Sequence, residues 1–329
     1  MNRSRRVLAV LVLTAFPACV PGQAQGPEPF GIDVAHSVVD FTVRQVGFAK
    51  VRGQFKQYRG TILYDPQDLL HSRAEVVIQI RSIDTGNEDR DKHLQSKDFF
   101  DVEQSPVIVF HSERIEKKAS GAVLVGTLAM HGVTKGISIP FRIVSLEQPD
   151  QWGNRRIAFE AEIDLNRKDF GIIGPPFWSS LISDEVRIEI SVAASIPNYE
   201  RWRFQSGAKP SIGEVLLKTA TENGAAAARK QFFDLRDTQS DAYNFDPGEI
   251  VLAARRLVQA NRVDDGIALM EMLPEAFPKL ASVPLLYEEL ARFALKRGDL
   301  EAAAKHSRKA LELNKESTTA AVILAHLEK

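Results

Sequence analysis

The chain has 329 residues, with 42 lysines and arginines against 43 aspartates and glutamates, and its formal net charge is −1. Hydrophobic residues make up 44% and charged residues 26%, which is typical of a soluble globular protein with one large domain or two ordinary ones. Because no basic excess is present, the composition argues against a nucleic-acid-binding function.

Residues 1–26 have the pattern of an export signal. Three arginines precede an apolar run at residues 7–16, and small residues follow as far as Ala24. The run is too short to span a bilayer, so we expect a bacterial protein that is periplasmic or secreted, with no transmembrane segment. Cys19 is the only cysteine, which excludes an intramolecular disulfide. Cleavage near Ala24 would remove Cys19, whereas processing as a lipoprotein would leave it as a lipid anchor.

Residues 27–197 form the first predicted domain, and their hydrophobic residues recur with the period of a β-strand. Val39, Phe41 and Val43 alternate with polar residues, and a further strand is expected within residues 54–65. Similar alternation occurs at residues 76–80, 108–110, 124–130, 137–143, 159–165 and 186–192. About eight half-buried strands predict an antiparallel sandwich or barrel.

A helical pattern replaces the alternation further along the chain. Residues 198–210 are a predicted polar linker, and residues 211–329 are rich in alanine, leucine and charged residues. Ser211 begins a capping box, Asp246 precedes a proline at a helix start, and Gly298 separates two helices. These signals predict an all-α second domain.

The second domain also contains a repeat. Residues 285–313 resemble a tetratricopeptide unit, and residues 250–278 and 211–237 resemble it more loosely. Three stacked helical hairpins are about the minimum that buries a continuous core, and such arrays present a groove to a peptide or helix. We therefore expect a tetratricopeptide-like array that docks a protein partner.

The stretch SIDTGNEDRDKHLQSKDFFDVEQSPVIVFHS, residues 82–112, concentrates carboxylates, a histidine and two phenylalanines between strand-like runs. Such groups could serve acid/base catalysis or bind a metal. Helix capping explains the carboxylates more simply, because Thr85 and Glu88 have the spacing of a capping box and acids in the first turn complement the helix dipole. We expect a short helix here that covers the rim of the β domain, with Phe99 and Phe100 beside it.

Neither a catalytic nucleophile nor a metal site is indicated. Five histidines lie in the β domain, but no two have the spacing at which one helix or strand presents two ligands. No nucleophile elbow occurs. We expect no catalytic residue, no metal and no cofactor. A shell of about eight strands is either filled by side chains or holds one slender apolar ligand, and Gly126 and Ala161 would leave room for one.

Several separated segments resemble the YceI-like family, in order and with its spacing. They are IDVAHSVVDFTV (32–43), VRGQFKQYRGTI (51–62), residues 82–110, GTLAMHGVTKGISIPF (126–141) and DLNRKDFGI (164–172). The resemblance implies a lipocalin-like, eight-stranded antiparallel barrel, exported in bacteria, that binds a long polyisoprenoid or similar lipid in its lumen. It does not imply an enzyme.

The resemblance also implies a set of ligand-binding residues. The predicted lumen lining is Phe41, Val43, Phe55, Ile78, Ile80, Phe110, Leu128, Phe141 and Phe159. The predicted mouth, where a polar head group would lie, is His36, Asp84, His93 and Phe100. Two alternatives stay open: a structural or assembly protein with a packed barrel, and an enzyme that acts on a lipid-linked substrate with the ionisable mouth residues.

Overall fold

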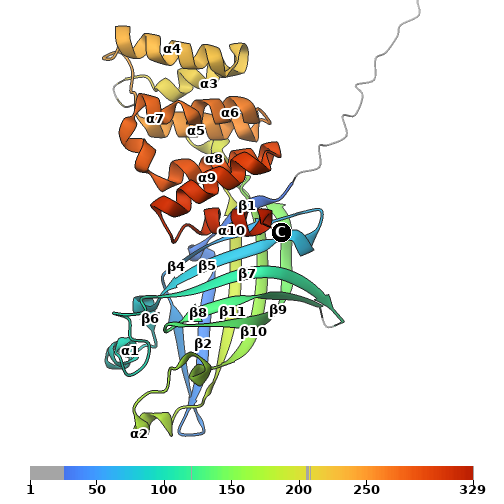
Figure 1. Cartoon of the computed structure of the whole chain (residues 1–329), viewed down its shortest axis with the longest axis vertical. Helices are drawn as coiled ribbons and strands as arrows, with labels where there is room; N and C mark the ends of the chain where they lie inside the picture. The colour runs from blue at the N-terminus through green and yellow to red at the C-terminus, as the bar shows by residue number, and fades with distance from the viewer. Residues whose placement is uncertain (1–25, 120, 205–206, 208, 329) are drawn as a thin grey trace, which may run out of the picture.

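The computed structural model describes residues 26–119, 121–204, 207 and 209–328. A β-barrel is followed by a stack of helices that extends from one end of the barrel (Figure 1). The predicted fold class, an eight-stranded antiparallel barrel followed by an all-α region, is confirmed. The predicted export signal and Cys19 lie outside the described residues.

Within the described chain, eight antiparallel strands close the barrel in the order β1-β4-β5-β7-β8-β9-β10-β11 and back to β1. β2, β3 and β6 extend this wall beyond β11. The strands are β1 (Glu28–Ile32), β2 (Val38–Gln45), β3 (Ala49–Phe55), β4 (Tyr58–Tyr64), β5 (Arg73–Gln79), β6 (Ile83–Asp84), β7 (Val107–Lys118), β8 (Gly121–Met130), β9 (Val133–Pro149), β10 (Arg155–Asn166) and β11 (Glu185–Ile196). Their alternating sequence places one set of side chains inside the barrel.

Gly126 does not have the expected role of leaving room in the barrel interior. A Cβ on Gly126 would lie 2.2 Å from the carbonyl oxygen of His111 on β7. The register of β7 and β8 shifts between Ser112 and Arg114, and this bulge brings the β7 backbone against the glycine. The missing side chain therefore accommodates the neighbouring strand, whereas Ala161 does line the interior.

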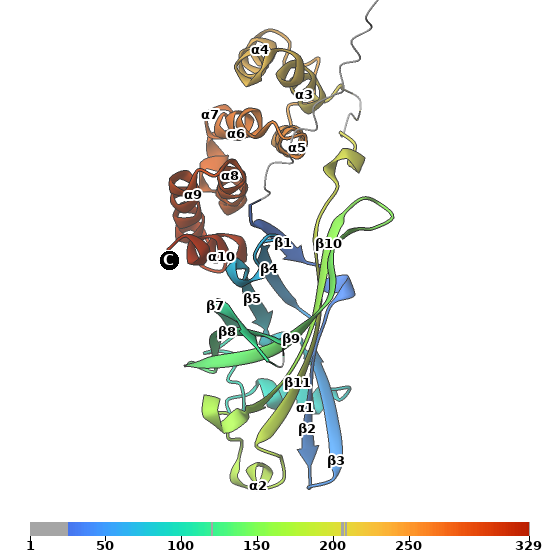
Figure 2. The ribbon, with the colours of Figure 1, turned by 90° about the vertical axis from the view of Figure 1, so that its right-hand side faces the viewer.

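Short helices connect the strands, and two of them matter for the site. α1 (Glu88–Gln95) follows β6, and α2 (Pro176–Ser179) lies between β10 and β11. Both lie at the end of the barrel away from the helical stack (Figures 1 and 2). The remaining short helices are η1 (Val34–His36), η2 (Leu69–His71), η3 (Ile80–Ser82), η4 (Arg167–Phe170), η5 (Tyr199–Arg201) and η6 (Pro278–Ser282).

The C-terminal region consists of stacked antiparallel helices around their own apolar core. α3 pairs with α4, α5 with α6 and α8 with α9, and α5 packs on α3 while α6 packs on α4 and α8. The helices are α3 (Ile212–Asn223), α4 (Ala225–Thr238), α5 (Pro247–Gln259), α6 (Val263–Glu271), α7 (Leu273–Ala276), α8 (Pro284–Arg297), α9 (Leu300–Leu313) and α10 (Thr318–Leu327).

The predicted caps are confirmed. Ser211 accepts hydrogen bonds from the backbone N–H groups of Gly213 and Glu214 at the start of α3. Asp246 caps α5, which begins with a proline. Gly298, with φ 81°, ends α8 in the left-handed conformation that glycine adopts without strain.

The helical region is joined to the barrel by a packed interface. α10 lies across β4 and β5. Leu63 of β4 is fully buried among residues of α8, α9 and α10. Beside it, the Thr61 hydroxyl oxygen lies 3.0 Å from that of Thr318 and 3.1 Å from that of Thr319. Buried apolar contact and satisfied hydroxyls together fix the stack on the outer face of the barrel.

Candidate ligand-binding cavity

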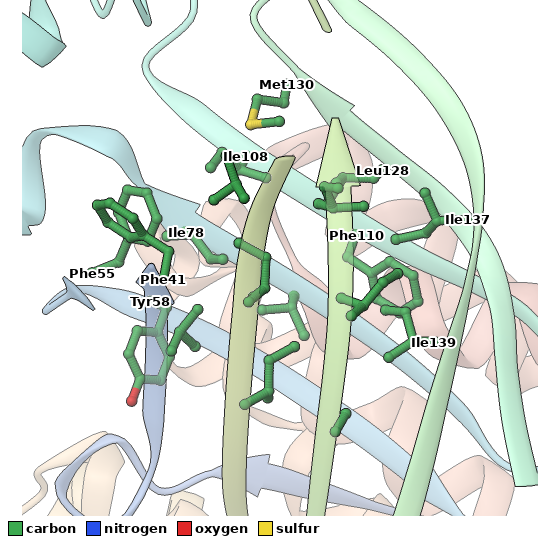
Figure 3. Close-up of a pocket in the computed structure, with 18 of the residues that line it drawn as sticks. Phe41, Phe55, Tyr58, Ile78, Ile108, Phe110, Leu128, Met130, Ile137 and Ile139 are labelled. Atoms are coloured by element: carbon green, nitrogen blue, oxygen red, sulfur yellow. The ribbon is translucent and has the colours of Figure 1, made fainter. Parts of the chain in front are cut away.

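The barrel encloses a cavity of about 620 Å³ with an almost wholly apolar wall. Figure 3 shows side chains from several strands converging on it: Phe41, Phe55, Tyr58, Ile78, Ile108, Phe110, Leu128, Met130, Ile137 and Ile139. Aromatic rings pair along the wall, with centroids 5.7 Å apart for Phe41 and Phe55. A space of this size and polarity suits one slender apolar molecule.

The residues of β11 show that the interior is hollow. Val186, Ile188, Ile190 and Val192 all line the cavity, and none of them is fully buried. A core packed at ordinary protein density would leave such inward side chains with almost no accessible surface. The structure therefore disagrees with the packed-barrel alternative.

The barrel is closed at the end next to the helices. Phe30, Tyr64, Ile157 and Ala194 pack there as a cluster of buried side chains. The Phe30 and Tyr64 rings meet edge to face with centroids 5.9 Å apart, and the Arg155 guanidinium lies 5.5 Å from the Phe30 ring centroid. These packed side chains block entry of a ligand from this end.

The cavity opens at the opposite end, beside α1 and α2. Asp89, Arg90 and His93 of α1 and Trp178 of α2 belong to its wall. Asp89 and Trp178 are also exposed to solvent. The cavity therefore reaches the surface between these two helices, and we call this opening the mouth.

A hydrogen-bonded group fixes one positive charge at the mouth. Arg90 Nε donates to the Thr85 hydroxyl and Arg90 Nη2 donates to the Thr85 carbonyl, each at 2.7 Å. The Asp91 carboxylate accepts from the Thr85 backbone N–H at 2.9 Å. Because Thr85 and Arg90 both line the cavity, a guanidinium is held beside an apolar wall.

The predicted rim helix is present as α1, but its cap is not the predicted one. Asn87, two residues after Thr85, accepts the hydrogen bond from the Arg90 backbone N–H at 2.9 Å. The acidic residues do lie in the first turn of α1, where negative charge interacts favourably with the helix dipole; they are Glu88, Asp89 and Asp91. Thr85 is not a cap because its hydroxyl is bonded to the Asp91 and Arg90 side chains.

His93 connects α1 to the other side of the mouth. Its ring lies edge to face with Phe99 at 5.0 Å and with Trp178 at 6.4 Å between centroids. Its Nε2 atom is 3.2 Å from the Asp98 carboxylate. His93 therefore lies at the mouth and contacts α2 across it.

Arg167 holds the segment 171–184, which contains α2. The side chain is only 6% exposed, and it donates to the Asp184 carboxylate at 3.0 Å. It also donates to backbone carbonyls at 2.5–3.3 Å, those of Ile172, Ile173, Ser179, Ile182 and Ser183. One guanidinium thus fixes the irregular backbone that forms this side of the mouth.

The structure brings most of the predicted ligand-binding residues together. Those found in the cavity wall are Phe41, Val43, Phe55, Ile78, Phe110, Leu128, Phe141, Phe159, His93 and Phe100. Phe100 lies at the mouth end, edge to face with Phe55 at 6.3 Å between ring centroids.

Ile80 and Asp84 do not line the cavity. Ile80 begins the turn η3, which interrupts the alternation after β5, and its side chain is fully buried in the surrounding core. Alternation resumes in β6, where Ile83 lines the cavity and its neighbour Asp84 faces outward, paired with Lys56 at 2.5 Å. Both predictions were wrong because the strand is broken by a turn.

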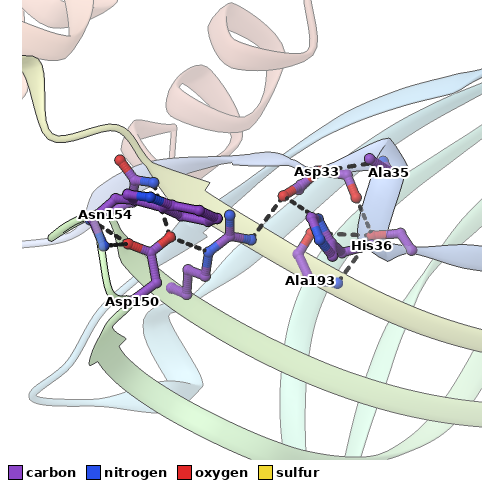
Figure 4. Close-up of polar contacts among 9 residues, drawn as sticks. Asp33, Ala35, His36, Asp150, Asn154 and Ala193 are labelled. Carbon is purple, nitrogen blue, oxygen red and sulfur yellow. Dashed lines mark hydrogen bonds and ion pairs between the residues drawn. The ribbon is translucent and has the colours of Figure 1, made fainter. Parts of the chain in front are cut away.

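His36 is also absent from the cavity wall, because it belongs to a polar network on the outer surface (Figure 4). Its Nδ1 atom lies 2.9 Å from the Asp33 carboxylate, which also accepts from Arg156 at 2.7 Å. Arg156 in turn donates to Asp150 at 2.8 Å. Burial alone would raise the pKa of Asp33, but the hydrogen bonds from Arg156 and His36 outweigh it and lower that pKa.

Of the mouth residues named above, sequence reasoning missed four: Thr85, Asp89, Arg90 and Trp178. A basic residue within the predicted rim helix was a usable signal for Arg90. The run PPFW at residues 175–178 was a weaker signal, because aromatic residues in a loop are as often packed as exposed.

No group of three or more histidine, cysteine, aspartate or glutamate side chains is arranged to hold a metal ion within the described ranges. Among those same residues, no helix has the length and hydropathy needed to cross a membrane.

Known proteins resemble the barrel part of the chain. The YceI-like domain family matches residues 30–194. A UPF0312 protein of Yersinia enterocolitica is 33% identical over 160 residues, which cover 48% of this chain and 80% of that protein. A UPF0312 protein of Pseudomonas aeruginosa is 31% identical over 193 residues, which cover 57% of this chain and 96% of that protein.

A solved structure of similar shape is that of a polyisoprenoid binding domain from Saccharophagus degradans implicated in plant cell wall breakdown. It is 16% identical, with a TM-score of 0.41, and the match covers 51% of this chain and 98% of that one. The sequence matches decide the family. Because the family covers half of the chain and the Pseudomonas relative is matched over nearly its whole length, this chain belongs to the YceI-like family.

Proposed function

We propose that this protein binds one long apolar chain, of a polyisoprenoid or similar lipid, in the barrel cavity. The observation that carries the proposal is a hollow apolar interior that is closed at one end and open at the other. Burying apolar surface contributes about 25 cal/mol per Å², so an extended hydrocarbon chain gains stability along its whole length there. The proposal involves no catalysis and no cofactor.

The mouth supports a fixed orientation for such a ligand. The apolar tail would point toward the closed end, and a polar head group would lie beside Arg90 and His93. A guanidinium with planar donors suits a phosphate or carboxylate head group, and an imidazole donates or accepts as its tautomer allows. Asp84 and His36 lie elsewhere, so they contribute nothing to this head-group site.

Mass spectrometry of an organic extract of the native protein, purified from the compartment in which it resides, tests the proposal. We expect a stoichiometric lipid; polyisoprenoids are sought first because the Saccharophagus domain binds that class. A binding assay with cis-parinaric acid then compares two variants. Ala161→Trp fills the cavity from β10 and should abolish binding, whereas Ser191→Trp, on the exposed face of β11, should not. Equal binding by both variants would refute the proposal.

We further propose that the helical region is a tetratricopeptide-like docking module. Its support is the stacking of α3 and α4, α5 and α6, and α8 and α9 in antiparallel pairs. Cross-linking mass spectrometry in cells that make the protein should link lysines of these helices to a partner. Cross-links confined to the barrel would contradict the docking role.

The cellular location is part of the same proposal. Export by the N-terminal signal would place the barrel in the periplasm or outside the cell, and processing as a lipoprotein would attach lipid to Cys19. Determination of the mature N-terminus by mass spectrometry tests this directly. A first residue near 25 indicates cleavage after Ala24, and an acylated Cys19 indicates a lipoprotein.

A further inference from the structure

Exposed apolar side chains lie beside the mouth of the cavity, on the β2–β3 turn and on the segment that contains α2. We call the set Val46, Phe48, Ile173, Phe177 and Trp178 the apolar rim. Phe48 is 78% exposed and Phe177 is 69% exposed, which is unusual for phenylalanine. Val46 and Phe48 belong to the β2–β3 turn, Ile173 precedes α2, and Phe177 and Trp178 belong to α2; the turn and α2 lie together at the end of the barrel opposite the helical stack (Figure 2).

The apolar rim is held in place by backbone hydrogen bonds. The Val46 N–H donates to the Leu181 carbonyl at 2.7 Å, and the Arg44 N–H donates to the Ser183 hydroxyl at 3.0 Å. Val46 has φ 55°, a left-handed conformation that a β-branched residue rarely adopts. The β2–β3 turn and the segment 171–184 therefore form one surface that keeps apolar side chains in solvent.

The two stretches that contribute the apolar rim carry only positive charges, and the neighbouring acidic residues at the mouth, Glu88, Asp89 and Asp91, belong to α1. No aspartate or glutamate occurs in residues 41–64 or in residues 170–183, the two stretches that contribute the rim. Arg44 and Lys50, both exposed, flank Val46 and Phe48 on the β2–β3 turn. Aromatic side chains next to cations are the composition that favours the interface of a bilayer containing anionic lipid.

We infer that the apolar rim inserts into the surface of an anionic lipid bilayer, with the mouth facing the membrane. This inference rests on the proposed function, because a lipid bound in the cavity must enter or leave through the mouth. Direct contact lets an apolar chain pass between bilayer and barrel without crossing water, where each exposed CH₂ is unfavourable by about 0.8 kcal/mol. Trp178, which belongs both to the rim and to the cavity wall, makes the two surfaces continuous.

Flotation of the protein with vesicles of phosphatidylethanolamine and phosphatidylglycerol tests the inference. All variants are made in a Cys19→Ser background, because a lipid anchor would itself bind vesicles. We expect Phe48→Ser/Phe177→Ser to weaken vesicle binding by at least about tenfold. The matched control, Leu285→Ser/Leu300→Ser, removes two leucines of the helical region that are 52% and 55% exposed, and it should bind vesicles like the parent.

A charge variant supplies an independent readout. Lys50→Gln should weaken binding to vesicles with phosphatidylglycerol but not to vesicles of phosphatidylcholine alone. Equal binding of the parent and the Phe48→Ser/Phe177→Ser variant would overturn the inference. Failure of the parent to bind vesicles would also overturn it. A third contrary result would be a dimer of the parent in light scattering and a monomer of the Phe48→Ser/Phe177→Ser variant, because the rim would then bind a second copy of the chain.

The proposed function is tested separately in solution. Phe48 and Phe177 do not line the cavity, so the Phe48→Ser/Phe177→Ser variant should bind cis-parinaric acid as well as the parent does in the absence of vesicles. Loss of vesicle binding with retained cis-parinaric acid binding supports the inference. If the parent binds vesicles through the rim but never binds a lipid in solution, the proposed function fails while the membrane contact stands.

Discussion

One isoleucine in the closed end of the barrel and one in its hollow part allow a direct comparison. Ile157 of β10 is 0% exposed and packs with Phe30 and Tyr64. Ile188 of β11 also points inward, but it borders the cavity and is only partly buried. We predict that Ile157→Ala destabilises the lipid-free barrel much more than Ile188→Ala does.

The difference in free energy of unfolding follows from burial. Isoleucine to alanine removes about three carbons, each contributing about 0.8 kcal/mol when fully buried, and a new cavity adds to this loss. For Ile157 we expect a loss of about 3–4 kcal/mol. For Ile188 no new cavity forms and part of the side chain is already accessible, so we expect a loss of about 1 kcal/mol.

Urea unfolding of delipidated protein measures both losses. Hydrogen exchange of peptides from β10 and β11 reports on the barrel alone, so that unfolding of the helical region does not contribute. Equal losses in the two variants would refute the reasoning, because they would mean that Ile188 is packed as tightly as Ile157. The proposed lipid cavity would then be absent from the protein in solution.

Three other changes test the interface and the mouth. Burial alone would raise the pKa of Glu28, but Arg155 and Lys296 outweigh it and lower that pKa below its ordinary value of 4.5. The carboxylate therefore stabilises the fold above about pH 4.5, and this stability is lost as the pH falls through the lowered pKa. In the Glu28→Gln variant, the melting temperature should change less with pH in that acid range. A variant whose melting temperature follows pH as the parent's does would contradict this. A lysine at position 167 cannot form the hydrogen bonds that Arg167 donates to five carbonyls. In the Arg167→Lys variant, thermolysin should therefore cut the segment 171–184 at least about tenfold faster than in the parent. Cleavage at the parent rate would show that other contacts hold the segment. Leu63→Ala should destabilise the docking of α10 by about 3 kcal/mol and speed hydrogen exchange in α10, and exchange at the parent rate would argue against a packed interface.

The barrel and its lining were largely predictable because strand alternation is a local property of the sequence. Phe41, Val43 and Phe159 line the cavity, as their positions in the alternating pattern predict. The alternating pattern gave a wrong prediction at Ile80, because the turn η3 interrupts the strand there. Asp84, which follows that turn, faces outward. The cap of α1 was misplaced by two residues because Thr85 and Asn87 are both good caps, and only the bonds of Thr85 to Arg90 and Asp91 decide between them.

The direction of the cavity could not be predicted from the sequence. Phe30 and Ile157, which close one end, have the same alternating pattern as Ile163 and Ile188, which line the open part. The difference arises from which side chains of distant strands meet, as Phe30 does with Tyr64. Likewise, nothing in the pattern of β4 shows that its outer face is covered by α10.

The strand β4 separates the two proposed activities within one protein. Ile62 lines the cavity, while its neighbours Thr61 and Leu63 face the opposite way and are buried against the helical region. The helices therefore cover the outside of the barrel near its closed end, whereas α1 and α2, which border the mouth, lie at the other end (Figure 2). A partner bound to the helical stack would leave the mouth accessible. The proposed lipid exchange at a membrane and the proposed protein docking are thus sterically compatible. A protein that brings a lipid-carrying barrel to a partner needs both surfaces free at once.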